Sequence, residues 1–397
     1  MNIGHILWLA LIVSPGTIGS AAAVDQFETG AANSGFTLNG FGTLGIARSD
    51  NDQAQYIRDL SQPYGLTTNW SAKVDSVLGL QAGYRFDNEF DGMLQAISRY
   101  RYDGSYRPEI SWAFLHYSPN PDLNLRVGRL GTEFYMTADS RLVGYANLTV
   151  RPPPDYFGPL IFSYLDGFDV DLAKPVTNGL LRGKLFAGYS PETSPFVGAI
   201  TWDLSGTLLV GGYLDYQTGP WQIRLGHAEV RFNKELPLDA LVPGIIEAAP
   251  ELSVLDQWAR FDSLGAVYDQ GPFQLQLMLS RTRHDSAAYE DTKAGYAIAS
   301  YRIGKVTPYL GYSRVTSKPP RFDPASPPLA AQIGSATHSD QHTWFLGGRW
   351  DIRKDLDLKV QVDSIQGSPS SIFPFRGDPV VWDGRMTVFS LTLDFMF

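Results

Sequence analysis

The sequence has no cysteine, few charged residues and no long apolar run, and each absence excludes a class of protein. Without cysteine, the chain can form neither a disulfide scaffold nor a thiolate metal site. Charged residues make up 18% of the 397 residues and aromatic residues 13%, whereas a disordered chain needs high charge and few aromatics. The longest apolar run, residues 6–13, is far shorter than the about 20 residues of a membrane-spanning helix. A helical membrane protein is therefore excluded.

The sequence also lacks an excess of basic residues. It has 41 Asp and Glu against 32 Lys and Arg, which gives a net charge of -9. Proteins that wrap nucleic acid depend on a dominant basic surface, so we expect no nucleic-acid partner. No nucleophile and base can be paired by their spacing, and we predict neither catalytic residues nor a cofactor or metal.

The N-terminal segment has the features of a signal peptide. The apolar residues 6–13 are followed by the helix breaker Pro15-Gly16 and by small residues at 20–23. The Ala21-x-Ala23 pattern fits signal peptidase cleavage, so we predict a signal peptide at residues 1–23 and a mature chain of residues 24–397. The basic residues that usually precede the apolar core are missing. A buried N-terminal helix is the alternative.

The rest of the chain alternates apolar and polar residues with a period of two. The alternation is clear in residues 77–86, 273–280, 356–363 and 389–397. A period of two indicates β-strands with one apolar and one polar face. We predict about sixteen strands, at residues 36–46, 73–86, 90–102, 109–118, 122–130, 164–173, 179–190, 206–217, 220–232, 256–269, 272–284, 292–303, 305–316, 341–352, 355–366 and 386–397.

Short and long connections alternate between these strands. Tight turns rich in Gly, Pro, Asn and charged residues separate longer connections such as 131–163, and a short helix is expected within residues 236–251. In a membrane barrel made of hairpins, all turns at one rim face one compartment, and closure leaves no unpaired edge in lipid. A soluble β-sandwich or propeller would carry more charge on its outer face. We therefore predict an all-β fold, a transmembrane antiparallel β-barrel.

The chain ends on Phe397, with apolar residues at every second position back to Phe389. Such a terminal strand resembles the signature that the outer-membrane assembly machinery recognises. Together with the signal peptide, it predicts a protein of the outer membrane of a Gram-negative bacterium, surrounded by outer-membrane lipid and lipopolysaccharide.

Two stretches resemble the general porins of Gram-negative outer membranes. They are Leu123-Asn-Leu-Arg-Val-Gly-Arg-Leu130, which runs into a long connection, and the residues 144–147, 150–153 and Tyr156 within that connection. The resemblance implies a sixteen-stranded barrel, often a homotrimer, whose third loop folds inward and narrows the channel. The corresponding loop would be residues 131–163, stiffened by three prolines at 152–154.

A channel of this kind needs a radius, lining polarity and an electrostatic profile rather than a catalytic group. The strand register places six basic residues on the polar face: Arg85, Arg99, Arg101, Arg126, Lys184 and Arg224. The third loop would oppose them with Glu133, Asp139 and Asp155, although it lacks a dense acidic cluster and also holds Arg141. Arg151 and Tyr156 could line the constriction, or Arg151 could attach the loop to the wall through an ion pair.

The sequence thus predicts an outer-membrane porin for passive diffusion of ions and small hydrophilic solutes. Alternatives are a substrate-selective channel, or a non-conducting barrel that acts as an enzyme or an adhesin. The solute, the ion preference and the oligomeric state are not determined by these patterns.

Overall fold

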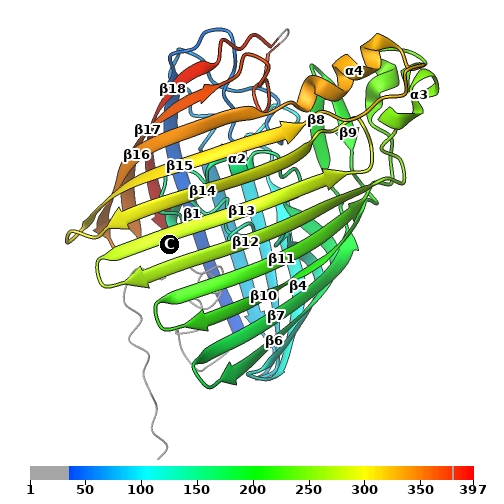
Figure 1. The fold of residues 1–397 in the computed structure, drawn as a ribbon. Helices are drawn as coiled ribbons and strands as arrows, with labels where there is room; N and C mark the ends of the chain where they lie inside the picture. The colour runs from blue at the N-terminus through cyan, green and yellow to red at the C-terminus, as the bar shows by residue number, and fades with distance from the viewer. Residues whose placement is uncertain (1–34, 378–379) are drawn as a thin grey trace, which may run out of the picture.

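A computed structural model of the chain describes residues 35–377 and 380–397. The predicted signal peptide at residues 1–23 lies outside these residues and stays a prediction. Within the described residues, sixteen strands form one closed antiparallel barrel (Figure 1). The first strand pairs with the last, from Phe41 opposite Met396 to Ser49 opposite Val388, so no strand of the barrel has a free edge.

The barrel strands match the sixteen predicted ones, with ends that differ by a few residues. Their bounds are β1 (Gly35–Ser49), β2 (Val77–Arg85), β3 (Phe90–Arg99), β4 (Glu109–Asn120), β5 (Leu123–Gly131), β6 (Tyr164–Val176), β7 (Gly179–Tyr189), β10 (Leu208–Thr218), β11 (Trp221–Arg231), β12 (Trp258–Gln270), β13 (Phe273–His284), β14 (Asp291–Tyr301), β15 (Val306–Lys318), β16 (Asp340–Arg353), β17 (Leu356–Gly367) and β18 (Arg385–Met396).

The two faces of the barrel wall differ as the period of two predicts. On β7, Leu185 is 70% exposed while the adjacent Lys184 is 9% exposed. On β2, Leu78 and Leu80 are exposed, while Gln81, the residue after Leu80, is buried. Exposed leucines would be costly in water but are favourable in hydrocarbon. The apolar set therefore forms the outer surface, and the polar set points inward.

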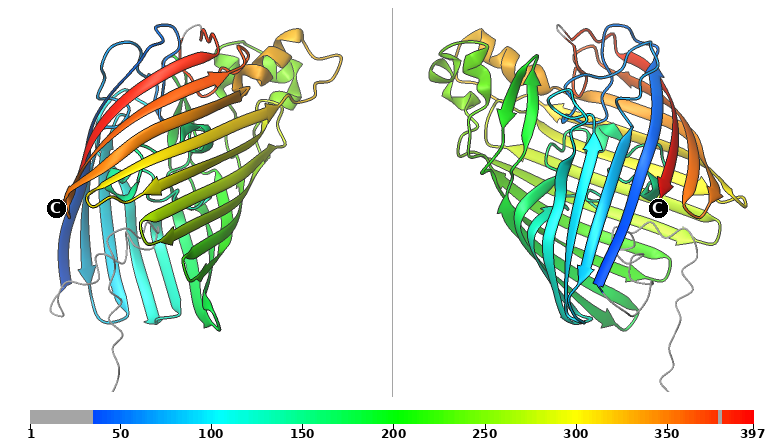
Figure 2. Two further views of the ribbon diagram at one scale, coloured as in Figure 1. Left: turned by 60° about the vertical axis from the view of Figure 1, so that its left-hand side comes forward. Right: turned by 180° about the vertical axis from the view of Figure 1, so that it is seen from behind.

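The connections separate by length between the two ends of the barrel (Figure 2). Tight turns such as 121–122, 219–220 and 354–355 lie at one end, and the longer connections lie at the other. The longer ones contain all the short helices of the described residues: η1 (Gly144–Ala146), α2 (Pro154–Phe157), η2 (Pro237–Ala240), α3 (Ile245–Ala248), η3 (Pro250–Leu252), α4 (Pro328–Gly334) and η4 (Ser335–Thr337). None of these helices has the length and apolar character needed to cross a membrane. The short helix expected within 236–251 is present.

Two local features differ from what the sequence indicated. The connection between β7 and β10 contains a separate hairpin that the sequence did not predict, made of β8 (Thr193–Val197) and β9 (Ile200–Asp203). Arg101 was expected on a strand of residues 90–102, but β3 ends at Arg99. The chain turns there because the Arg101 N–H donates to the Ser105 carbonyl and the Gly104 N–H donates to the Arg101 carbonyl.

The third long connection, residues 132–163, contacts parts of the wall far from the strands that it joins. Its helix α2 contacts β14, β15 and β16, and its turn η1 contacts β1 and β18. In the strand order, β14, β15 and β16 lie across the barrel from β5 and β6, which the connection links, and β1 and β18 lie four and five strands from β5. The third connection therefore brings its side chains against inward-facing residues of the opposite wall.

Candidate functional site

A cluster of charges surrounds Glu133 of the third connection. Lys184 Nζ lies 2.5 Å from Glu133 Oε1, and Arg126 and Arg224 approach the same carboxylate at 3.4 Å and 3.7 Å. The three basic residues come from β7, β5 and β11, and they point inward from the wall. A single carboxylate on the third connection is thus held among three cations of the wall.

Wall carboxylates complete this cluster. Asp169 on β6 pairs with Arg126 at 2.5 Å, and Asp215 on β10 pairs with Arg224 at 2.9 Å. Both pairs join residues that stand directly opposite each other on neighbouring strands. These two acids were not among the residues predicted from the sequence, although the alternation places them on the polar face. They could have been predicted by asking which residue of the neighbouring strand stands directly opposite Arg126 and Arg224.

Asp139 lies beside the same cluster. Burial and the nearby Glu133 carboxylate together raise the pKa of Asp139 to about 6, against the opposing effect of Lys184, Arg224 and Arg126. The Asp139 carboxylate accepts the backbone N–H of Ser140 at 2.9 Å. Glu133 and Asp139 are therefore close to the basic residues that the sequence placed on the polar face.

The other predicted basic residues lie elsewhere. Arg85 is exposed at the last residue of β2, next to a tight turn. Arg99 is buried near the long-connection end, where it pairs with Glu109 at 3.3 Å and donates to Ser61 Oγ at 2.6 Å. Arg101 lies 3.8 Å from both Glu109 and Asp103. These three residues do not join the Glu133 cluster.

Arg151 attaches the third connection to the wall. Its fully buried guanidinium binds Asp75 through two nitrogens, at 2.8 Å and 2.6 Å, and lies 3.2 Å from Asp363. It also donates to Ser390 Oγ at 2.6 Å and to the Tyr56 hydroxyl at 3.3 Å. Of the two roles considered for Arg151, the contacts are those of an anchor rather than of a side chain that faces open solvent.

Further contacts fix the same connection. Arg141 braces it internally by donating to the carbonyls of Ala138 and Phe162 at 2.8 Å and 2.9 Å. Asp155 accepts hydrogen bonds from Ser313 and Gln341 of β15 and β16, at 2.6 Å and 2.7 Å, and so faces the wall opposite the Glu133 cluster.

Cations of the far wall also hold the third connection. Lys359 donates to the Gly144 carbonyl at 2.7 Å, and Arg349 donates to the Tyr145 carbonyl at 2.7 Å. The connection is therefore attached at both sides of the barrel, through Glu133 on one side and through Arg151, Asp155, Lys359 and Arg349 on the other.

Tyr156 lies in an aromatic cluster rather than in an open passage. It is 2% exposed, and its ring packs 4.9 Å from that of Tyr135 and 5.2 Å from that of Tyr296. Its hydroxyl donates to the Leu279 carbonyl at 3.4 Å. Tyr156 thus fills the space between the third connection and the strands β13 and β14.

One Ser–His–Glu group lies among the long connections, and its geometry bears on the enzyme alternative. His338 Nδ1 lies 2.8 Å from Glu290 and 3.3 Å from Ser317 Oγ, and the Ser317 hydroxyl donates to Glu290. A hydrolase needs the carboxylate on one imidazole nitrogen and the serine on the other. Here both partners share Nδ1, which makes the group a link between two connections. Within residues 35–377 and 380–397, no three His, Asp or Glu side chains are grouped to hold a metal ion.

A buried carboxyl group near the third connection should make stability depend on pH. Glu192, between β7 and β8, accepts the N–H groups of Ser163 and Tyr164 at 2.8 Å and 3.3 Å. Burial raises the pKa of Glu192 from 4.5 to about 7, although these hydrogen bonds oppose the shift. The Glu192 carboxyl group therefore binds its proton more tightly in the folded state than in the unfolded state. Protonation of Glu192 stabilises the fold at low pH, and this contribution is lost as the pH rises from 4.5 through about 7.

We therefore expect the unfolding temperature of the detergent-solubilised barrel to fall over this pH interval, and the variant Glu192→Gln to show a smaller fall. Thermal unfolding at a series of pH values measures both. Equal slopes for the variant and the natural chain would contradict the assignment.

Comparison with solved structures places the fold among outer-membrane barrels. An anion-selective porin from Comamonas acidovorans is 17% identical, with a TM-score of 0.55, over 92% of this chain and 100% of that one. OmpF of Salmonella typhi is 10% identical, with a TM-score of 0.58, over 91% and 97%. The channel DcaP of Acinetobacter baumannii is 12% identical, with a TM-score of 0.52, over 91% and 97%. At these identities the likeness concerns the fold.

Sequence comparison, rather than the structural likeness, determines the family. A comparison with curated protein sequences returns no significant match. Residues 16–369, however, match the sequence profile of the Gram-negative porins. The match covers most of the chain, including all the strands that carry the Glu133 cluster. The fold, the family and the relatives agree on an outer-membrane channel protein, and the chain belongs to the Gram-negative porin family.

Proposed function

We propose that this porin forms a water-filled channel for passive diffusion of ions and small hydrophilic solutes, with no catalytic step. The observation that carries the proposal is the Glu133 cluster, in which a carboxylate of the third connection stands among Arg126, Lys184 and Arg224 of the wall. Fixed charges of both signs, held by rigid strands, create a field that acts on a passing solute.

The third connection would set the narrowest part of the passage. Its attachments to β5, β6, β7 and β11 on one side and to β15 through β18 on the other support a position across the lumen. Such a position lets polar solutes pass between fixed charges. Apolar solutes would displace the water that solvates these charges without replacing its hydrogen bonds, so their passage is disfavoured. Arg99 and Arg101 would act at the wider entrance, near the long connections.

Single-channel recording in a planar bilayer tests this proposal. The folded full-length protein should give discrete current steps whose size rises linearly with voltage, that is, a constant conductance, because a passive pore has no gate to open. Absence of conductance from protein that migrates as a folded barrel would contradict the proposal and would favour the adhesin or enzyme alternatives. Strong block by one class of solute would favour a substrate-selective channel instead.

Assembly and membrane partners belong to the same proposal. A solved OmpT of Vibrio cholerae, 11% identical with a TM-score of 0.52, is described as a trimer form, and we propose a homotrimer for this chain as well. Phe397 is 65% exposed at the end of β18, where the assembly machinery of the outer membrane could bind it. The apolar outer surface would contact outer-membrane lipid, including lipopolysaccharide.

A further inference from the structure

The outer wall changes from apolar to charged at one height across four neighbouring strands. Outward leucines on β10, β11, β12 and β13 stand directly opposite one another, in the row Leu214, Leu225, Leu264 and Leu279. The next outward row toward the long connections begins with Gly212 on β10 and is charged on β11 to β14, where it consists of His227, Asp262, Arg281 and Lys293. In porins the longer loops are extracellular. This charged row therefore marks the boundary between hydrocarbon and headgroups of the outer leaflet.

Two cations of this row have no hydrogen-bond or ion-pair partner among residues 35–377 and 380–397. Arg281 on β13 and Lys293 on β14 are exposed and stand directly opposite each other. Within the described part of the chain, neither side chain has a hydrogen bond or ion pair. Like charges at directly opposed positions repel and weaken a strand pair. An anion between them would remove that cost.

Three nearby acids already have cationic partners, so in the described structure they do not pair with Arg281 or Lys293. Asp262 stands opposite Arg281, but its two carboxylate oxygens bind His227 at 2.8 Å and Arg283 at 3.1 Å. Arg260 binds Asp285 at 2.6 Å, and Arg314 binds Asp340 at 3.4 Å. Asp262, Asp285 and Asp340 therefore pair with other cations and not with Arg281 or Lys293.

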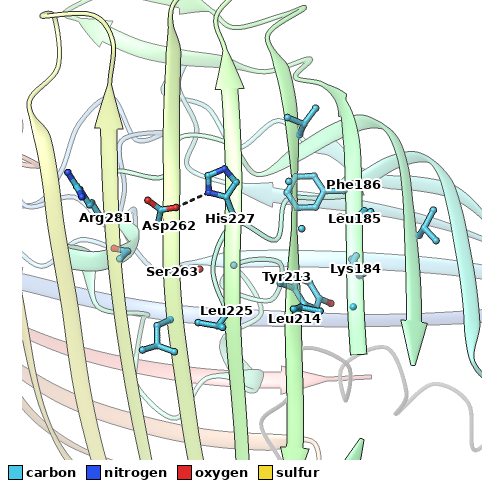
Figure 3. A pocket seen from close by; sticks show the side chains of 18 of the residues that line it. Lys184, Leu185, Phe186, Tyr213, Leu214, Leu225, His227, Asp262, Ser263 and Arg281 are labelled. Atoms are coloured by element: carbon cyan, nitrogen blue, oxygen red, sulfur yellow. Dashed lines mark hydrogen bonds and ion pairs between the residues drawn. The ribbon is translucent and has the colours of Figure 1, made fainter. Parts of the chain in front are cut away.

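A hollow of about 1160 Å³ lies directly below this row on the outer wall (Figure 3). Its lining includes the exposed side chains of Leu185, Leu214 and Leu225, and Arg281 stands at its rim in the figure. Gly212 keeps the surface low, because a Cβ there would lie 2.4 Å from the Lys184 carbonyl oxygen. The wall thus combines an apolar hollow with a pair of unneutralised cations at the membrane boundary.

We propose that this surface binds one lipopolysaccharide molecule of the outer leaflet. A phosphate of its lipid A headgroup would lie between Arg281 and Lys293, and an acyl chain would occupy the hollow. The charge complementarity and the position at the leaflet boundary identify an anionic lipid, and lipopolysaccharide is the phosphorylated lipid of this leaflet. The inference depends on the position of the barrel in the membrane and not on whether the channel conducts.

The test measures lipopolysaccharide binding to the folded full-length chain in detergent by native mass spectrometry. The variant R281A/K293A should bind about thirtyfold more weakly than the natural chain, because each basic residue near an anionic lipid surface contributes about 1 kcal/mol and 1.4 kcal/mol is a factor of ten. Lipopolysaccharide stripped of its lipid A phosphates should bind the natural chain weakly, and the variant equally weakly.

Two further variants separate charge from shape. R353A/K354A removes the same charge from exposed residues at the opposite rim and should bind lipopolysaccharide as the natural chain does. Gly183→Trp fills the hollow, where an added Cβ meets only Leu214 Cδ2 at 3.4 Å and the Tyr213 carbonyl oxygen at 4.0 Å. It should weaken binding of both the phosphorylated and the stripped lipid.

Equal lipopolysaccharide binding by R281A/K293A and the natural chain would overturn the proposal. So would an equal loss in R353A/K354A, which would indicate a general charge effect. A change in oligomeric state without a change in bound lipid would also overturn it, because this wall would then be covered by a second copy of the chain. Conductance is recorded separately, so a failure of the channel proposal is distinguishable from a failure of this one.

Discussion

Replacement of Arg151 with methionine should destabilise the folded barrel by about 3–5 kcal/mol, the usual cost of removing one partner from a buried ion pair. Arg151 is fully buried, and it compensates the carboxylates of Asp75 and Asp363. Without it, two acids would remain in the interior with no cation in contact. Equilibrium unfolding in urea, followed for protein folded in lipid vesicles, measures the loss.

The carboxylates provide the control for this prediction. In the variant R151M/D75N the cation and its bidentate partner are both removed, and part of the lost stability should return, because one uncompensated charge has gone. The third connection should also become a substrate for added protease in R151M. If R151M unfolds at the same urea concentration as the natural chain, Arg151 does not anchor the connection.

Replacement of Glu133 with glutamine should shift the channel toward anions. The carboxylate is contacted by Lys184, Arg126 and Arg224, and its removal leaves these cations with one acid fewer. A unit charge at about 7 Å in water contributes about 0.6 kcal/mol to the energy of a passing ion. Removing the charge favours chloride and disfavours potassium by this amount each, about 1.2 kcal/mol together. We therefore expect the chloride-to-potassium permeability ratio, obtained from the reversal potential in a KCl gradient, to rise about sevenfold.

A matched control lies on the outer wall. Glu229 on β11 faces outward, where it pairs with Arg260 at 3.5 Å, and Glu229→Gln removes the same charge from a position outside the channel. It should leave the reversal potential unchanged. An equal shift in both variants, or no shift in E133Q, would mean that Glu133 does not face the path of the ions.

The strands could be predicted from the sequence because the membrane imposes a strict rule on alternate residues. Every second side chain, such as Leu185 against Lys184, meets either lipid or the interior, so the period of two persists along each strand. The hairpin β8–β9 has no such constraint, because it lies among the long connections. Arg101 was placed on a strand because backbone turn bonds, rather than the alternation, end β3 at Arg99.

The partners of the charged residues were less predictable. Asp169 and Asp215 follow from the cross-strand register, which requires only that neighbouring strands be aligned correctly. The partners of Arg151 do not follow from any local pattern, since Asp75 and Asp363 are 76 and 212 residues away in the sequence. Whether Arg151 lines the passage or anchors the third connection depends on the folded path of that connection, which no strand register specifies.

If this chain is a porin channel, inward side chains line a water-filled path while their neighbours along each strand face lipid. The chain has no cysteine, so single cysteines can be introduced without background labelling. Arg126 points inward to Asp169, and the adjacent Val127 is 58% exposed on the outer wall. A negatively charged, water-soluble thiol reagent should reduce the single-channel conductance of Arg126→Cys and leave that of Val127→Cys unchanged. A response of Val127→Cys alone, or of neither variant, would show that Arg126 does not face a water-filled, ion-conducting path.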